Sequence, residues 1–371
     1  MAPSRVFQPI NNVELRPQNG YNIVASATAD FSGGDVLVGF SATGWATAAA
    51  TPLSVELWFD GQPTGGRIRM EADVAESHLA LGHGWVWIGR VPAGPHRLDL
   101  VAGMQTTTDQ NDRASVTVWE MGDGCAVRFA RNAGCPMGTG QTLMTQQFVG
   151  GRKQFLISAG MSGRDPRPPG VTGGTAAVDG KSVGALEVFE NDSARRACVP
   201  TDIVVSAEPG GSHVAVLAAS PGTYTDSADT AQLAVVDWVN PDSAPDVLKL
   251  EPPLQNATAN TQPGDGGTIA STTFQSSGGP LLIKVSASVW TRVTGGMSLW
   301  VGVLLDSSPR GKGYTGIYAN QAMTHMSTFT NDLVVTDVPA GTHTLELIAE
   351  RSVVTDGNDR VSVLVLEFPR V

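Results

Sequence analysis

The chain has little charge, few aromatic residues and few cysteines. Only 16% of its 371 residues are charged and 6% are aromatic, whereas glycine (43) and proline (23) are abundant. Helical bundles and coiled coils depend on Glu, Lys, Arg and Leu, so this composition argues against them. Because 41% of the residues are hydrophobic, the chain can build folded cores, which argues against disorder.

Basic residues are scarce relative to acidic ones. The 24 Lys and Arg residues face 35 Asp and Glu residues, for a net charge of −11. A negative chain does not suit a nucleic-acid partner. The N-terminal sequence has no apolar stretch and no cleavage pattern, and no run approaches the roughly 18 apolar residues of a membrane span. We therefore expect no signal peptide and no membrane insertion.

The cysteine pattern of this chain predicts no zinc site. There are three cysteines, Cys125, Cys135 and Cys198, and none lies in a CxxC or a Cys/His zinc spacing. An odd number favours free or buried thiols. A Cys125–Cys135 bridge is the alternative, because these two lie close together in a Gly-rich segment.

One short pattern occurs three times along the chain. It reads P-x-G-x-H and is followed by T-D-x-x-D, with the His and the last Asp 16 residues apart in each copy. The copies are separated by 117 and 130 residues, without gaps inside the pattern. Fixed separations of this kind indicate tandem repeats of one structural unit.

The repeats divide the chain into three units of about 100 residues each. The expected organisation is an N-terminal arm (1–19), a first unit (20–121), a connector (122–138), a second unit (139–239), a Pro-rich connector (240–267) and a third unit (268–371). Proline lacks the N–H that a central strand needs, so the Pro-rich segment is predicted to be an extended linker.

Each unit reads as antiparallel β-structure. Strands predicted in the third unit are 269–275, 280–290, 297–305, 314–318, 323–328, 332–337, 342–350 and 360–367. They are short, rich in Val, Leu, Ile and Thr, and separated by turn residues. The predicted fold is all-β, with three tandem antiparallel β-sandwich repeats of jelly-roll type. A seven-stranded immunoglobulin-like sandwich is the alternative.

The repeated histidines are His96, His213 and His343. Each begins a strand and shares its parity with core residues, so it is predicted to be a structural residue satisfied by backbone groups. The strand geometry separates it by very roughly 20 Å from the last Asp of the pattern, so the two cannot form a catalytic dyad within one unit. Contact with a neighbouring repeat or subunit is the first alternative, and metal binding or catalysis the second.

The repeated aspartates lie in the loop that follows. These residues are Asp109, Asp112, Asp226, Asp229, Asp356 and Asp359. Asp and Thr side chains commonly accept hydrogen bonds from local backbone N–H groups and so shape turns. A weak Ca²⁺ site is the alternative, although the spacing lacks the full oxygen set of an EF-hand. No H-E-x-x-H or G-x-S-x-G pattern occurs, so we expect neither an enzyme nor a cofactor.

The hairpin around the repeated histidine resembles a known class of proteins. Val338–Leu345 (VPAGTHTL) and Val91–Leu98 (VPAGPHRL) are similar to hairpins in virion proteins of tailed bacteriophages. Similar hairpins occur in units of the tumour-necrosis-factor and complement C1q type, which often trimerise. The resemblance implies jelly-roll units and a homotrimer. The second unit departs from it, because Glu208–His213 reads EPGGSH.

The resulting hypothesis is a non-enzymatic minor tail protein of a tailed-phage virion, assembled in the host cytoplasm with itself and other virion proteins. A capsid decoration protein is the first alternative. A carbohydrate-binding or adhesin module is the second. It would bind a host surface glycan through exposed aromatic residues such as Trp85, Trp87 and Tyr314.

Overall fold

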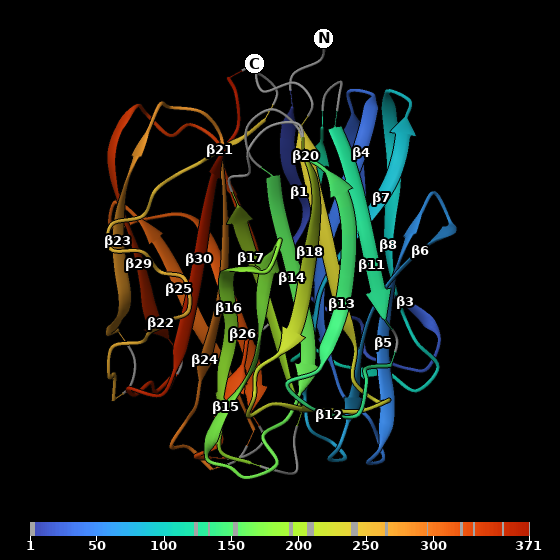
Figure 1. The fold of residues 1–371 in the computed structure, drawn as a ribbon, viewed down its shortest axis with the longest axis vertical. Coiled ribbons are helices and arrows are strands. Elements are labelled where there is room, and N and C mark those ends of the chain that lie inside the picture. The colour runs from blue at the N-terminus through green and yellow to red at the C-terminus, as the bar shows by residue number, and fades with distance from the viewer. Residues whose placement is uncertain are drawn as a thin grey trace.

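The computed structural model describes residues 4–121, 125–132, 134–150, 155–192, 196–205, 211–238, 244–263, 266–294, 296–319, 322–328, 331–350 and 352–370. All helix or strand assignments in these residues are β-strands paired in antiparallel sheets, which confirms the all-β prediction. The strands run along the long axis of the molecule, and the two termini lie at the same end of it (Figure 1).

The first unit is a sandwich of two four-stranded sheets. One sheet has the spatial order β1 (Arg5–Glu14), β10 (Arg113–Glu120), β4 (Gly34–Gly44) and β7 (Leu79–Val91). The other has the order β3 (Asn22–Phe31), β8 (Gly94–Ala102), β5 (Thr51–Phe59) and β6 (Gln62–Ala72). The dipeptide strands β2 (Gln18–Asn19) and β9 (Thr107–Thr108) pair with each other.

The second unit repeats this arrangement. Its first sheet has the order β11 (Cys125–Asn132), β20 (Ala231–Trp238), β14 (Phe155–Gly163) and β17 (Ala197–Val205). Its second sheet has the order β13 (Thr142–Val149), β18 (Ser212–Ala219), β15 (Gly170–Val178) and β16 (Lys181–Glu190). The dipeptides β12 (Gly138–Thr139) and β19 (Tyr224–Thr225) pair as before.

The third unit has the same plan with broken edges. In its first sheet, β21 (Asp246–Val247) and β22 (Ala257–Thr258) both pair with β30 (Arg360–Glu367), which is followed by β24 (Leu281–Val289) and then by β27 (Met326–Ser327) and β28 (Asn331–Val335). Its second sheet has the order β23 (Thr268–Ser276), β29 (Gly341–Glu350), β25 (Met297–Leu305) and β26 (Ser308–Ala319).

All three units therefore share one topology. When the long strands of a unit are numbered one to eight in chain order, with each broken edge counted once, the sheets read 1-8-3-6 and 2-7-4-5. Two four-stranded sheets connected in this way form a jelly roll. We call the 1-8-3-6 sheets the inner sheets and the 2-7-4-5 sheets the outer sheets.

The segments 1–19, 122–138 and 240–267 differ from the prediction of an arm and two connectors, because each holds the first strand of a unit. β1 pairs with β10 from Arg5 to Glu14, and β11 pairs with β20 along its whole length. In the third unit Pro252 and Pro253 cannot donate to a ladder, so only two dipeptides pair with β30. The expected boundaries at 122 and 239–240 lie outside the described residues.

Burial differs between the two kinds of sheet. The outer strand β5 alternates between buried and half-buried residues, as expected for a sheet with one face on the core. The inner strand β14 is buried at every position. Its second face is covered by the neighbouring units.

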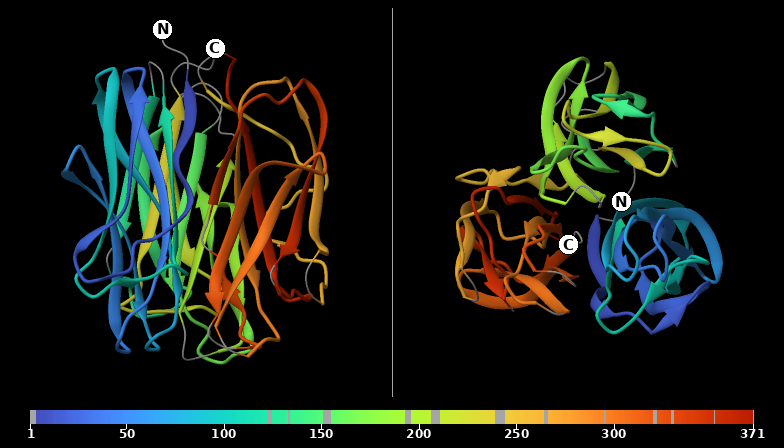
Figure 2. Two further views of the ribbon diagram at one scale, coloured as in Figure 1. Left: turned by 180° about the vertical axis from the view of Figure 1, so that it is seen from behind. Right: turned by 90° about the horizontal axis from the view of Figure 1, so that it is seen from below.

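The three units surround a common axis (Figure 2, right). One buried apolar cluster lies between them and draws residues from all three inner sheets. Leu37, Leu156 and Leu282 occupy its corresponding positions on the third strands, and Trp119, Val236 and Leu366 those on the eighth strands. One chain thus forms three similar jelly rolls around an apolar axis, in the manner of a trimer.

Candidate functional site

Each repeated histidine contacts an aspartate in a turn of its own unit. Nδ1 of His96, His213 and His343 lies 2.7 Å from a carboxylate oxygen of Asp60, Asp179 and Asp306 respectively. The second oxygen of each carboxylate accepts a backbone N–H from the residue after the histidine, at 2.8, 2.8 and 2.9 Å. We call these three His–Asp pairs the turn clasps.

The turn clasps refine the prediction for the histidines. Only one ring nitrogen, Nε2, contacts a backbone group. In His96 it lies 3.0 Å from the Pro92 carbonyl, and in His343 it lies 2.8 Å from the Pro339 carbonyl. The other partner is the Asp that begins the turn between the fourth and fifth strands. The pKa of Asp179 is held below its usual value by His213 and by the Val214 N–H.

The repeated T-D-x-x-D segments form three matching turns. The second Asp of each accepts the backbone N–H of the first at 2.9 Å, and the first accepts the N–H two residues further on at 2.7–2.9 Å. A hydroxyl from the third strand donates to the second Asp in each unit: Thr43, Ser162 and Ser288, at 2.9, 2.8 and 2.9 Å. These contacts make the aspartates turn-forming residues.

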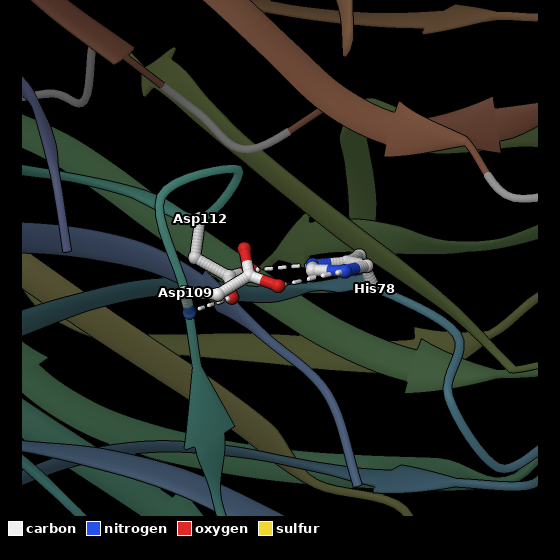
Figure 3. A group of neighbouring side chains, drawn as sticks. All are labelled: His78, Asp109 and Asp112. Carbon is white, nitrogen blue, oxygen red and sulfur yellow. Dashed lines mark hydrogen bonds and ion pairs between the residues drawn. The ribbon is translucent and has the colours of Figure 1, made fainter. Parts of the chain in front are cut away.

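A side chain that can carry positive charge lies against each of these turns. Figure 3 shows His78 beside Asp109 and Asp112, with Nδ1 2.9 Å from Asp112 and Nε2 3.7 Å from Asp109. His325 repeats this at 2.8 Å from Asp359 and 3.7 Å from Asp356. In the second unit Arg196 takes the place, with Nε 3.1 Å from Asp229 and Nη2 2.8 Å from Asp226. We call His78, Arg196 and His325 the pin residues; each directly precedes the sixth strand of its unit.

The geometry favours ion pairs over the alternative of Ca²⁺ sites at Asp109, Asp112 and their equivalents. His78 and His325 each bring one ligand atom within 4.8 Å of two carboxylate oxygens, which is close enough for a metal ion. The two ring nitrogens of each pin histidine nevertheless face different carboxylates, as Nε and Nη2 of Arg196 do, and one imidazole cannot direct both of its nitrogens at one ion. Ca²⁺ also requires six to eight oxygen ligands, and histidine supplies none.

Burial and the neighbouring charges shift the pKa values of Asp229, Asp359 and Arg196 in opposite directions. It raises the pKa of Asp229 above its usual value, and the guanidinium of Arg196 opposes that shift. Burial likewise raises the pKa of Asp359, and His325 opposes it. For Arg196 the surrounding carboxylates outweigh burial and raise its pKa. Arg196 and His325 therefore each oppose the effect of burial on the carboxylate that they contact.

Every pin residue also contacts the neighbouring unit. The contact position is the penultimate residue of the neighbour's fifth strand: Glu71 for Arg196, Phe189 for His325 and Tyr318 for His78. Nη1 of Arg196 is 3.2 Å from Glu71 and also pairs with Asp73. The rings of His325 and Phe189 are 4.8 Å apart, and those of His78 and Tyr318 are 4.6 Å apart. The pin residues thus lie at the three joints between units.

Sequence reasoning missed the pin residues, although a signal was present. His78 and His325 are 247 residues apart, the same separation as His96 and His343. The corresponding position in the second unit falls in the Arg195–Arg196 pair. Because the second unit carries arginine instead of histidine, a search for repeated identical residues passes over the site.

A second charged group is buried at the joint between the third and first units. Nζ of Lys284 is 2.5 Å from Asp332 and 3.3 Å from Nε2 of His83. All three are nearly inaccessible to water. Burial and the charge of Lys284 lower the pKa of His83 to about 4, so the ring is neutral at pH 7. The ammonium also lies 4.6 Å from the Trp85 ring.

Cavities lie inside the third unit and at the joints between units. One of about 390 Å³ lies where the Pro-rich segment leaves the sheet, between Leu250, Leu254 and Val363. Another of about 250 Å³ lies between the first and second units, with Arg69 and Met161 in its walls. The second cavity is lined by both Cys198 and His83. Burial raises the pKa of the Cys198 thiol to about 12 and lowers the pKa of the His83 ring to about 4, so at pH 7 the thiol is protonated and the ring is a weak base.

The cysteines and tryptophans are mostly interior. Cys135 and Cys198 are buried free thiols whose pKa burial raises to about 12, so the alternative of a Cys125–Cys135 bridge is wrong. Trp85 is only 1% exposed and donates to Ser158 of the second unit at 2.7 Å, so it is not a glycan platform. The side chains of Cys125 and Tyr314 lie outside the described residues.

Comparisons with known proteins identify no relative by sequence. No protein-family model matches, and no curated protein matches. Within the described residues, no helix is long and apolar enough to cross a membrane.

Similar solved structures are distant. They include PNGase F, a glycosylasparaginase from Flavobacterium meningosepticum (12% identity, covering 64% of this chain and 97% of that one, TM-score 0.33). PNGF-II has 7% identity, covers 95% and 84%, and has a TM-score of 0.32. The VP2 subviral particle of infectious bursal disease virus has 11% identity, covers 94% and 80%, and has a TM-score of 0.23. These likenesses are too weak to indicate a function, and the fold assignment rests on the strand pairing itself.

Proposed function

We propose that this protein is a non-enzymatic structural component of a tailed-phage virion and acts as a minor tail protein. The observation that carries the proposal is the closure of three jelly rolls around one buried apolar axis within a single chain. Interfaces of this kind belong to symmetric protein assemblies. The hairpin resemblance to phage virion proteins supplies the biological context.

The chemistry of the described residues supports a building block. The ion pairs of Arg196, His325, His343 and Lys284 lie in joints between units or in turns of one unit. Such groups hold a surface in place and are not free to transfer protons to a substrate. The rigid product is a three-lobed body whose outer sheets are available to other virion proteins.

Within this proposal the threefold association expected of a homotrimer is supplied by one chain. The apolar faces that separate subunits would bury are already covered. We infer that the chain enters the virion as a three-lobed monomer. Native mass spectrometry of the purified protein tests this, and a stable trimer of chains would contradict it.

The proposed function is tested on particles of the phage that encodes the chain. Gradient-purified virions are analysed by peptide mass spectrometry and by immunogold labelling with antibodies against the recombinant protein. Label on the tail is the expected result. Label spread over the head would replace the proposal by the decoration alternative, and absence of both peptides and label would end the virion hypothesis.

A second candidate, glycan binding, rests on the exposed Tyr21 and the half-buried Trp58 beside it in the first unit. Tyr21 is 51% exposed and meets the Trp58 ring at 6.0 Å, and the Trp58 indole donates to Glu56 at 3.3 Å. Aromatic faces beside a carboxylate suit sugar C–H and hydroxyl groups. Binding to host cell-wall glycan that disappears in Tyr21→Ala, while Met104→Ala is unaffected, would establish it. Equal binding by both variants would exclude this site.

A further inference from the structure

The apolar axis alone does not determine which unit lies beside which. The third strands present leucine to the axis in all three units, as Leu37, Leu156 and Leu282. All units also share one topology. The third strand of each unit thus presents the same apolar residue to either neighbour, whether that neighbour belongs to the same chain or to a second copy, while the eighth strands differ (Trp119, Val236 and Leu366). Contacts that repeat head to tail close into a ring or extend into open assemblies, depending on which copies meet.

The pin residues and their partners differ from joint to joint, whereas the third strands place leucine at the axis in all three units. At the joint of the first and second units a guanidinium meets the carboxylates of Glu71 and Asp73. At the joint of the second and third units the imidazole of His325 meets the Phe189 ring, and the backbone N–H of His325 donates to Oδ1 of Asn191 at 3.0 Å. At the joint of the third and first units the partner is the Tyr318 ring.

Each pairing is matched in charge and shape to one neighbour. Glu71 and Asp73 are replaced at the corresponding positions of the second unit by Phe189 and Asn191, so charge changes on both sides of the joint together. The side chain of Arg196 is only 3% exposed. If it met Phe189 and Asn191 instead, it would lose two carboxylate partners without gaining water, which is costly for a buried charge.

We propose that His78–Tyr318, Arg196–Glu71/Asp73 and His325–Phe189/Asn191 form a set of specificity pairs that fixes the order of the units and closes the ring within one chain. The pairs disfavour docking of a unit onto a second copy of this chain, which the apolar axis would otherwise allow. Discrimination by polar groups at the margin of an apolar interface is a known route to specificity.

The test makes two joints alike in the full-length chain. The matched variant Arg196→His/Glu71→Phe/Asp73→Asn gives the first joint the pairing of the second. The mismatched variant Glu71→Phe/Asp73→Asn keeps Arg196 and removes only its two carboxylate partners on the first unit. Each protein is unfolded in urea, refolded at several concentrations and analysed by native mass spectrometry, with Lys249→Ala, in an exposed ion pair outside the joints, as control.

The proposal predicts separate outcomes for the two variants. The mismatched variant should melt at least about 5 °C below the wild type, because the buried charge of Arg196 loses two of its four carboxylate partners. The matched variant should melt within about 3 °C of the wild type, yet give at least threefold more dimers and larger oligomers after refolding. A merely structural role predicts wild-type oligomer levels for a well-folded matched variant, and that result overturns the proposal.

A reverse variant protects the test against a folding defect. His325→Arg/Phe189→Glu/Asn191→Asp gives the second joint the pairing of the first and carries the same prediction. If both matched variants fail to fold while the control refolds normally, the pairs are not interchangeable as units. The proposal is then wrong.

Discussion

The turn clasps and the pin residues are both sets of charged or polar pairs that occur three times, but only one set is uniform. All three clasps join a His to an Asp at 2.7 Å. The pin residues are His, Arg and His, and they meet Tyr, Glu and Phe on the neighbouring unit. The clasp contacts inside each unit are the same in all three units, whereas the pin contacts between units differ from joint to joint.

The largest expected effect is at the charged joint. Arg196→Met leaves Asp226, Asp229, Asp73 and Glu71 without their shared partner, so the free energy of unfolding should fall by about 3–5 kcal/mol. Urea unfolding at pH 7 measures this. Arg164→Met is the control, because Arg164 is 32% exposed and pairs only weakly with Asp226. Its loss should stay below about 1 kcal/mol, and equal losses would remove the distinction.

The axis and the unit cores should be equally important for stability. Leu282 faces the axis and Leu345 faces the core of its own unit, and both are fully buried. Each Leu→Ala change should lower the free energy of unfolding by about 3 kcal/mol, since a buried cavity results in both cases. A loss below about 1 kcal/mol for Leu282→Ala would mean that the units stay folded without their joints.

The buried group at the third joint predicts a pH dependence. The pKa of His83 is about 4 in the folded protein and about 6.5 in the unfolded chain. Between these values the unfolded chain binds a proton that the folded protein does not, so stability rises with pH from about 4 to 6.5. The contribution is at most about 3 kcal/mol and is fully present above pH 6.5. His83→Asn should flatten this part of a pH series of unfolding curves; an unchanged slope would contradict the assignment.

The smallest expected effects are the losses of stability when single clasps are removed, and these losses should differ between clasps. Both ring nitrogens of His343 lie within hydrogen-bond distance of a partner, whereas Nε2 of His213 has no hydrogen-bond partner among the residues that the structure describes. His343→Ala should therefore cost about 2 kcal/mol and His213→Ala about 1 kcal/mol. Thermal unfolding of the two variants side by side measures the difference. A larger loss for His213→Ala would show that the clasps are not ranked by their hydrogen bonds.

The outline of the fold was predictable because strand patterns are local. Strands predicted at 269–275 and 342–350 are observed as Thr268–Ser276 and Gly341–Glu350. The first strand of each unit was missed because the match between repeats is strongest around the hairpin of strands seven and eight. The site was predictable only in part: the aspartates were found, but their partners precede the sixth strand, far from them in sequence.

The sequence by itself determined that the chain is all-β, that it contains three related units, and that a His and two Asp recur in each. These properties depend on side-chain alternation and turn residues, which act over a few positions. Only the tertiary structure decided that the inner strand β14 is buried on both faces and that the units close around one axis. It also decided that each turn meets a pin residue matched to its neighbour, because such contacts form only when distant strands have already packed together.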